Sequence, residues 1–131
     1  MANEDQLGIL RQGVTAWNKW RTENSGPVDL SKAILSGADL HGADLHGADL
    51  IKANLNRANL NRANLHEADL TETDLSEADL SRSSLIETTI VRARLAGCRI
   101  YGISAWGLIL DDKTEQRDLV ITPPRINQPL L

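Results

Sequence analysis

The chain has 131 residues, and its formal charge of −4 provides neither the basic surface typical of a nucleic-acid-binding domain nor extreme acidity. With three Trp, one Tyr and no Phe, the core must be built from small aliphatic side chains. Its single cysteine, Cys98, excludes an internal disulfide, and no apolar run approaches the roughly 18 residues needed to span a bilayer. The opening MANEDQ also lacks the basic and apolar regions of a signal peptide. We therefore expect one soluble, cytoplasmic domain that binds neither nucleic acid nor membrane.

Residues 1–27 are predicted to form a capping helix and a linker. The helix would be a single amphipathic one, with Asn3 as its N-cap and a stop signal at Ser-Gly-Pro 25–27. Its apolar face would consist of Leu7, Leu10, Val14 and Trp17. A lid on the first repeats is the favoured interpretation. A membrane-surface or partner-binding helix is the alternative, although its charges are mixed rather than basic.

A five-residue repeat follows, from Val28 to about Leu110. Its centre falls at every fifth residue from 30 to 110, and fourteen of the seventeen centres are Leu. A small side chain, most often Ala, lies two residues before each centre, with Asp or Asn between them at ten positions from 29 to 79. A helix repeats about every 3.6 residues and a strand every two, so neither gathers this pattern on one side. The chain must turn a corner within each repeat.

The repeat therefore predicts a solenoid. Residues two apart in an extended segment face the same side, so the small residue and the Leu point inward while Asp or Asn points outward. The two remaining residues form the corner, and successive coils pair about 4.8 Å apart. The number of sides per coil stays open, because the glycines at 37, 42 and 47 recur at 97, 102 and 107, a shift that suits coils of 15 or 20 residues.

The C-terminal end departs gradually from the repeat. We predict a charged loop at 111–118 and then one last strand through Leu119 and Ile121, before Pro123-Pro124 ends regular structure. The expected organisation has three segments. They are the capping helix and linker (1–27), the repeat (28–110), and a C-terminal loop, short strand and Pro-containing tail (111–131).

The stretch ADLHGADLIKANLNRANLNRANLHEADL resembles the A(D/N)Lxx repeat of the pentapeptide-repeat proteins. The resemblance covers residues 28–110 and implies an all-β solenoid, a right-handed quadrilateral β-helix with four repeats per coil and about four coils. The N-terminal helix would add an α-helical cap. Some members of this family mimic DNA and bind DNA gyrase, usually as dimers joined at their C-termini. The resemblance thus implies gyrase binding as an alternative function, and a possible homodimer through the C-terminal coils.

DNA mimicry needs a long, evenly negative rod. Residues 29–110 carry 11 acidic and 8 basic side chains, a sum of only −3, and the two signs alternate in bands. On 20-residue coils Lys52, Glu72 and Arg92 would align as one ladder, and Arg57 and Glu77 as another. Local neutralisation is the first interpretation of these ladders, and a charged docking surface is the second.

No catalytic residue, cofactor or metal site is predicted. The three histidines, His41, His46 and His66, are expected to be ordinary outer-face residues, although 20-residue coils would stack His46 on His66. Zinc needs three or four ligands, and Cys98 occupies an inward small-residue position. A tube packed with leucine also leaves no cavity for a substrate, so an enzyme is not expected.

Late in the repeat, several outward positions become apolar. They are Ile86, Val91, Tyr101, Trp106 and Ile109. Exposed apolar groups gathered together mark an interface, so this set is the candidate interaction surface. The favoured interpretation is that the surface makes a self-contact or that the tail folds back over it, with its apolar side chains Leu119, Ile121, Ile126, Leu130 and Leu131. A foreign protein partner is the alternative. The predicted function is a non-enzymatic protein-interaction or scaffold module with an unknown protein partner.

Overall fold

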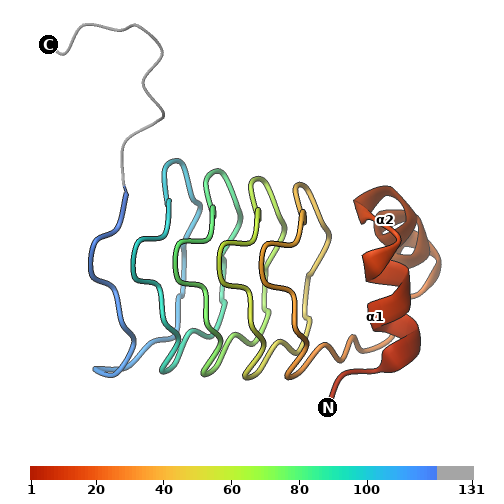
Figure 1. Cartoon of the computed structure of the whole chain (residues 1–131), viewed down its shortest axis with the longest axis horizontal. Coiled ribbons are helices and arrows are strands. Elements are labelled where there is room, and N and C mark those ends of the chain that lie inside the picture. Colours follow the sequence, from red (N-terminus) through yellow and green to blue (C-terminus); the bar gives the residue numbers. More distant parts are fainter. Residues whose placement is uncertain (121–131) are drawn as a thin grey trace, which may run out of the picture.

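Two helices and a four-sided solenoid make up the computed structural model, which describes residues 1–120. Helix α1 spans Glu4–Arg11 and helix α2 spans Val14–Glu23. Figure 1 shows both helices at one end of a row of stacked coils. Neither helix is long and apolar enough to cross a membrane, and no other helix occurs in residues 1–120. The predictions for Ile121 and for the tail after it lie outside the described residues.

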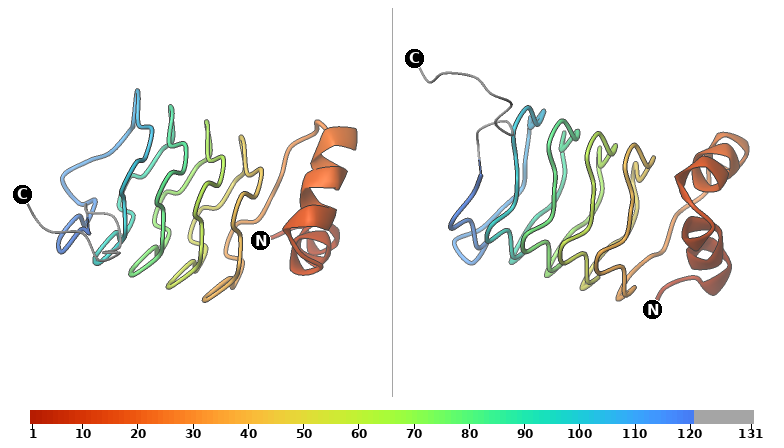
Figure 2. Two further views of the ribbon diagram at one scale, coloured as in Figure 1. Left: turned by 90° about the horizontal axis from the view of Figure 1, so that it is seen from above. Right: turned by 45° about the horizontal axis from the view of Figure 1, so that its top comes forward.

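Each coil contains 20 residues and therefore four repeats. Parallel β-bridges join each outward Asp or Asn to the residue 20 positions later, as in the series that runs from Asp29 through Asp49, Asp69 and Thr89 to Ile109. This spacing excludes the 15-residue coil that the sequence left open. It also confirms the expectation of about four coils, which Figure 2 shows stacked side by side.

The centres and the small residues form one continuous core, as predicted. Every centre from Leu30 to Leu95 is at most 7% exposed, and Ala43, Ala48 and Ala78 are fully buried. Burying a leucine contributes roughly 1.5–3 kcal/mol, so the row of centres supplies most of the apolar stabilisation of the rod.

The corners have a left-handed backbone at their second residue. The backbone angle φ lies between 55° and 73° at every fifth residue from Lys32 to Gly107. The carbonyl of the preceding centre accepts a hydrogen bond across the corner, as from the N–H of Ala33 to the oxygen of Leu30 at 3.1 Å. A positive φ at the third residue of such a turn is the mark of a type II turn. This turn geometry was not predicted from the sequence.

The corner also explains why Asp or Asn recurs at the outward position. The side-chain oxygen of Asp49 accepts a hydrogen bond from the N–H of Ile51, two residues later, at 2.9 Å. Asn54 does the same for Asn56 at 3.0 Å. This Asx-turn satisfies a corner N–H that no neighbouring coil reaches, and only a short side chain with an oxygen can make it.

The prediction of one N-terminal helix is wrong. Gln12 ends α1, and Gly13 adopts a φ of 118°, which reverses the chain into α2. Glycine adopts this backbone without steric cost. Gly13 was therefore the sequence signal for a break between two helices, and it was overlooked. Asn3 is confirmed as the N-cap, since its side chain accepts a hydrogen bond from the N–H of Gln6 at 3.1 Å.

Both helices nevertheless bury the predicted apolar residues against the first coil. Leu7, Leu10 and Trp17 are at most 4% exposed and belong to the same core cluster as the leucine row, while Val14 is half-buried. The indole N–H of Trp17 donates to the carbonyl of Asp44 at 2.8 Å.

Two side-chain amides of the helices bond to the backbone edge of the first coil. The Asn18 amide oxygen accepts from the N–H of Asp44 at 2.8 Å, and its NH₂ donates to the carbonyl of Gly42 at 3.0 Å. Gln6 makes the equivalent pair with the N–H of Asp29 at 2.8 Å and the carbonyl of Pro27 at 2.9 Å. In the rest of the rod, carbonyls of the preceding coil accept from the N–H groups equivalent to those of Asp29 and Asp44. At the first coil, these two side-chain amides accept those hydrogen bonds instead.

The prediction of a charged loop at 111–118 is also wrong, because the coil continues there with one extra residue. Arg94 pairs with Glu115 and Arg99 with Val120, an offset of 21 residues instead of 20. Thr114 occupies the inward small-residue position, where it is 8% exposed and donates its hydroxyl hydrogen to the carbonyl of Ile90 at 2.8 Å.

Candidate interaction surface

Three of the five predicted surface residues lie around one corner at the C-terminal end of the rod. Ile86 and Trp106 occupy that corner in successive coils, since Ser84 and Ser104, two residues before each of them, are bridged. Ile109 lies on the adjoining side, three residues after Trp106. Trp106 is 77% exposed and Ile109 is 52% exposed, whereas Ile86 is half-buried. We call these three residues the Trp106 corner.

The other two predicted residues lie at different corners. Tyr101 precedes the Trp106 corner by one repeat, and the guanidinium carbon of Arg82 lies 5.2 Å from the centre of its ring. Val91 follows Ile86 by one repeat and lies at the next corner. Both side chains are half-buried, so the five residues do not form one patch.

The structure adds exposed apolar groups that the sequence analysis did not select. Leu110 is 45% exposed and Val120 is 38% exposed. Leu110 occupies a core position by register, and its exposure follows from its place in the last coil. A cavity of about 70 Å³ lies inside the last coils of the rod. Its lining consists of inward side chains that include Ile100, Leu108 and Leu119. Leu119 is half-buried against the core, and the remaining apolar tail residues of the prediction lie outside the described residues.

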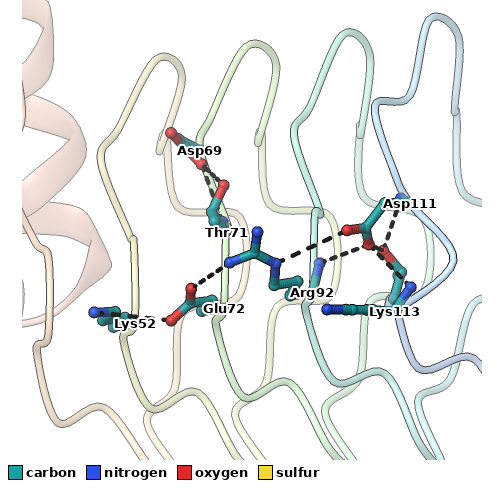
Figure 3. Close-up of polar contacts among 8 residues, drawn as sticks. Lys52, Asp69, Thr71, Glu72, Arg92, Asp111 and Lys113 are labelled. Carbon is teal, nitrogen blue, oxygen red and sulfur yellow. Dashed lines mark hydrogen bonds and ion pairs between the residues drawn. The ribbon is translucent and has the colours of Figure 1, made fainter.

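The predicted ladder of alternating charges is present and runs further than expected (Figure 3). The ammonium of Lys52 lies 3.8 Å from the carboxylate of Glu72, whose other oxygen lies 3.1 Å from the guanidinium of Arg92. Arg92 continues the ladder to Asp111 at 3.9 Å. Exposed pairs contribute about 0–1 kcal/mol each, so the ladder neutralises charge more than it stabilises.

Asp111 holds the corner that contains the extra residue. Its carboxylate accepts hydrogen bonds from the N–H of Arg92 and the N–H of Lys113, each at 3.2 Å (Figure 3). Desolvation would raise the pKa of Asp111, but these bonds and the charge of Arg92 outweigh it and hold the pKa below its usual value. The ionised carboxylate thus organises the inserted corner.

The second predicted ladder is confirmed at the next corner. The Nε of Arg57 donates to the carboxylate of Glu77 at 2.7 Å, and this bond raises the pKa of the Arg57 guanidinium. Both side chains are more than half exposed. The pair is a solvated surface interaction.

The stacking of His46 and His66 is confirmed, with ring centroids 5.4 Å apart. Two carboxylates that the sequence analysis did not connect with them, Glu67 and Glu87, occupy the second position of the same corner. The 20-residue offset was the signal that would have found them. His41 lies at another corner, where the second positions in the following coils are Arg62 and Arg82.

Cys98 is a core residue rather than a nucleophile. Its side chain is fully buried, and its thiol donates to the carbonyl of Leu75 at 2.8 Å. Desolvation by burial raises its pKa to about 12, so the thiolate that attacks substrates or binds metals does not form near neutral pH.

A family model of pentapeptide repeats matches residues 28–62 and 63–100, in eight copies. These two segments cover more than half of the chain. The chain belongs to the pentapeptide-repeat family. Membership makes the fold a right-handed quadrilateral β-helix, consistent with the four repeats per coil described above. The C-terminal coil to Val120 extends beyond the matched residues.

Solved structures of the family are similar over more than half of this chain. HetL of Nostoc sp. strain PCC 7120, involved in heterocyst differentiation regulation, is 35% identical over 70% of this chain, with a TM-score of 0.49. A protein of the Arabidopsis thaliana thylakoid lumen is 32% identical over 61% of this chain and 59% of its own, with a TM-score of 0.39. This chain spans 38% of the HetL chain.

QnrB1, a plasmid-mediated fluoroquinolone resistance protein, is more distant. A trypsin-treated form is 20% identical over 74% of this chain and 57% of its own, with a TM-score of 0.31. No curated protein sequence matches the chain.

Proposed function

We propose that the protein is a non-enzymatic interaction module whose protein partner docks on the Trp106 corner. Pentapeptide-repeat proteins are generally structural or interaction modules, which supports the class of function. The exposure of Trp106 carries the proposal. This side chain is 77% exposed at a corner position where the first two coils carry His46 and His66.

The chemistry of the corner favours a partner with an apolar pocket. Tryptophan is among the residues that contribute most to binding when a partner buries it, because it removes a large apolar area from water. Ile109 continues the apolar surface from Trp106 onto the adjoining side, with an exposed fraction of 52%. Bonds between coils hold the backbone at the carbonyls of Trp106 and Ile109, so the corner would present both side chains without ordering a loop on binding.

The test compares two exposed apolar positions at opposite ends of the rod. A photo-crosslinking amino acid is placed at Trp106 in one variant and at Ile34 in the other, since Ile34 is also exposed, at 71%. We expect one specific crosslinked protein from a lysate of the source organism with the Trp106 probe and none with the Ile34 probe. The double substitution Trp106→Ser, Ile109→Ser should abolish capture of that protein, while Ile34→Ser retains it.

Equal capture by both probes, or capture that survives the double substitution, would contradict the proposal. Circular dichroism and thermal unfolding of each variant establish that the coils remain folded. The substituted side chains are exposed, so their removal should change the free energy of unfolding by less than about 0.5 kcal/mol.

DNA mimicry toward gyrase gains no support from the geometry. The ladders place Lys52, Arg57 and Arg92 against the carboxylates that a mimic would present as an unbroken negative row. We expect no effect of micromolar protein on DNA supercoiling by gyrase, and inhibition or protection from a quinolone would revive this alternative.

We further infer that α1 and α2 act as the N-terminal cap of the solenoid. An open coil would expose leucines and unpaired backbone groups to water, and terminal caps are required in repeat proteins for that reason. The burial of Trp17 and the amide bonds of Gln6 and Asn18 support this role.

A further inference from the structure

A cluster of imidazoles and carboxylates occupies the same corner as Trp106, but in the earlier coils. His46 and His66 are the first residues of this corner in successive coils, and Glu67 and Glu87 are second residues. We call these four residues the histidine corner.

Three residues of the histidine corner already place donor atoms close together, and His46 contacts one of them. One donor atom each from His66, Glu67 and Glu87 lies within 4.8 Å of the other two. The Nε2 atoms of His46 and His66 lie 3.8 Å and 3.7 Å from the two carboxylate oxygens of Glu67. Bonds of about 2.0–2.1 Å from zinc to nitrogen or oxygen set tetrahedral donors about 3.4 Å apart. Side-chain rotations that shorten the separations of at most 4.8 Å by up to about 1.4 Å would reach that spacing.

The charges of the corner also favour a bound cation. Glu67 and Glu87 are second corner residues in successive coils, so two carboxylates are neighbours here, whereas the Lys52–Glu72–Arg92 and Arg57–Glu77 ladders alternate in sign. Within residues 1–120, no lysine or arginine forms an ion pair with either of them. A divalent ion between the two carboxylates would remove their repulsion.

The backbone beneath these side chains is fixed by bonds between coils. The N–H of Glu67 donates to the carbonyl of Ile86 at 2.9 Å, and the N–H of Glu87 donates to the carbonyl of Trp106. The N–H of His66 donates to the side chain of Asn64 at 3.0 Å. Binding would therefore order side chains alone, which lowers its entropic cost.

We propose that the histidine corner binds one divalent transition-metal ion of the zinc class through His66, Glu67 and Glu87, with His46 as the fourth ligand. Two imidazoles select zinc, copper or nickel over magnesium and calcium, which prefer oxygen donors alone. None of the four proposed ligands belongs to the proposed docking surface, so this inference does not depend on the proposed function.

The test is calorimetric titration of the full chain, purified without a histidine tag, with ZnCl₂ and separately with MgCl₂. We expect saturable binding of one Zn²⁺ per chain and no measurable heat with Mg²⁺. His66→Gln and Glu67→Gln should each weaken Zn²⁺ binding at least tenfold. His41→Gln is the matched control, because this exposed histidine lies beside arginines rather than glutamates, and it should leave the affinity unchanged within twofold.

A second readout locates the ion independently of affinity. In ¹⁵N spectra of the imidazoles, Zn²⁺ should shift the ring nitrogens of His46 and His66 and leave those of His41 in place. The proposal is overturned by the absence of saturable Zn²⁺ binding, by one ion per two chains, or by equal losses of affinity in His66→Gln and His41→Gln. Thermal unfolding in the absence of metal shows whether each variant keeps its fold.

Discussion

The two ends of the rod are built in different ways. At the N-terminal end, two helices close the core, and Trp17 is fully buried against the first coil. Toward the C-terminal end, the exposed fraction of the centres rises from 0% at Leu75 to 7% at Leu95 and 45% at Leu110. The middle coils are almost identical, so the difference arises from residues outside the five-residue repeat. The repeat specifies the interior of the rod, whereas non-repeating residues specify its ends.

The backbone edges differ in the same way. Gln6 and Asn18 satisfy N–H and C=O groups of the first coil with side-chain amides. At the other end the coil itself continues, with an extra residue at the corner that Asp111 holds and with Thr114 in the place of the usual alanine. We infer that the first end is closed by a cap and that the last coil offers the surface for interaction.

Removing the cap should have the largest effect. Deletion of residues 1–24 would expose Leu30 and its neighbours, and it would leave the edge of the first coil free to pair with another chain. We expect the truncated chain to aggregate, as measured by size-exclusion chromatography with light scattering. A soluble, monodisperse truncation would show that the helices do not act as a cap.

Shortening a centre should cost much more in the middle of the rod than at its C-terminal end. Leu60 is fully buried, so Leu60→Ala should lower the free energy of unfolding by roughly 2–5 kcal/mol. Leu110→Ala, at a centre that is already 45% exposed, should cost less than about 1 kcal/mol. Urea unfolding of both variants measures the difference, and equal losses would contradict the described exposure of the last coil.

The corner geometry predicts opposite effects at two equivalent positions. Gly42 and Arg62 are second corner residues in successive coils, with φ of 71° and 62°. A residue other than glycine pays about 1 kcal/mol in this region, so Gly42→Ala should destabilise the protein by about that amount and Arg62→Gly should stabilise it by a similar amount. Thermal unfolding would reveal the shifts, and a loss of stability in Arg62→Gly would contradict the assignment.

The smallest effect concerns Cys98 and alkaline pH. Its pKa is raised to about 12 by burial, so the folded chain keeps its proton where the unfolded chain loses it. Stability from this group is fully present below the unfolded pKa near 8.5 and is lost as pH rises toward 12, by less than about 1 kcal/mol at pH 9. Cys98→Ala should flatten the fall in melting temperature between pH 8 and pH 9, and an unchanged slope would contradict burial of the thiol.

The sequence predicted the interior well because the inward Leu and Ala repeat without interruption from 28 to 110. The sequence did not determine the number of sides per coil, because all corners have similar residues. Only the pairing between coils shows whether a coil contains three or four repeats. The extra residue near Asp111 was hidden for a related reason. Thr114 and Glu115 do not resemble the A(D/N)L unit, although they occupy its positions in the coil.

The candidate surface was predicted in part. Ile86 and Trp106 share a corner, as expected for 20-residue coils, because their separation is one full coil. Tyr101 was grouped with them by composition alone, and its corner is a different one. Glu87 escaped notice beside His66 because the two residues are 21 apart in the chain and meet only through the stacking of coils.

Hydrogen exchange at single amides tests the contrast between the ends most directly. The N–H of Asp44 in the first coil bonds to Asn18 of the cap, and that of Asn64 in the second coil bonds to the carbonyl of Ala43. If the helices complete the first coil, Asp44 will exchange as slowly as Asn64 in the intact protein, and Asn18→Ala will accelerate exchange at Asp44 alone. If Asp44 exchanges as fast as a freely exposed peptide while Asn64 is protected, the first coil is not closed by the helices and the account of the two ends is wrong.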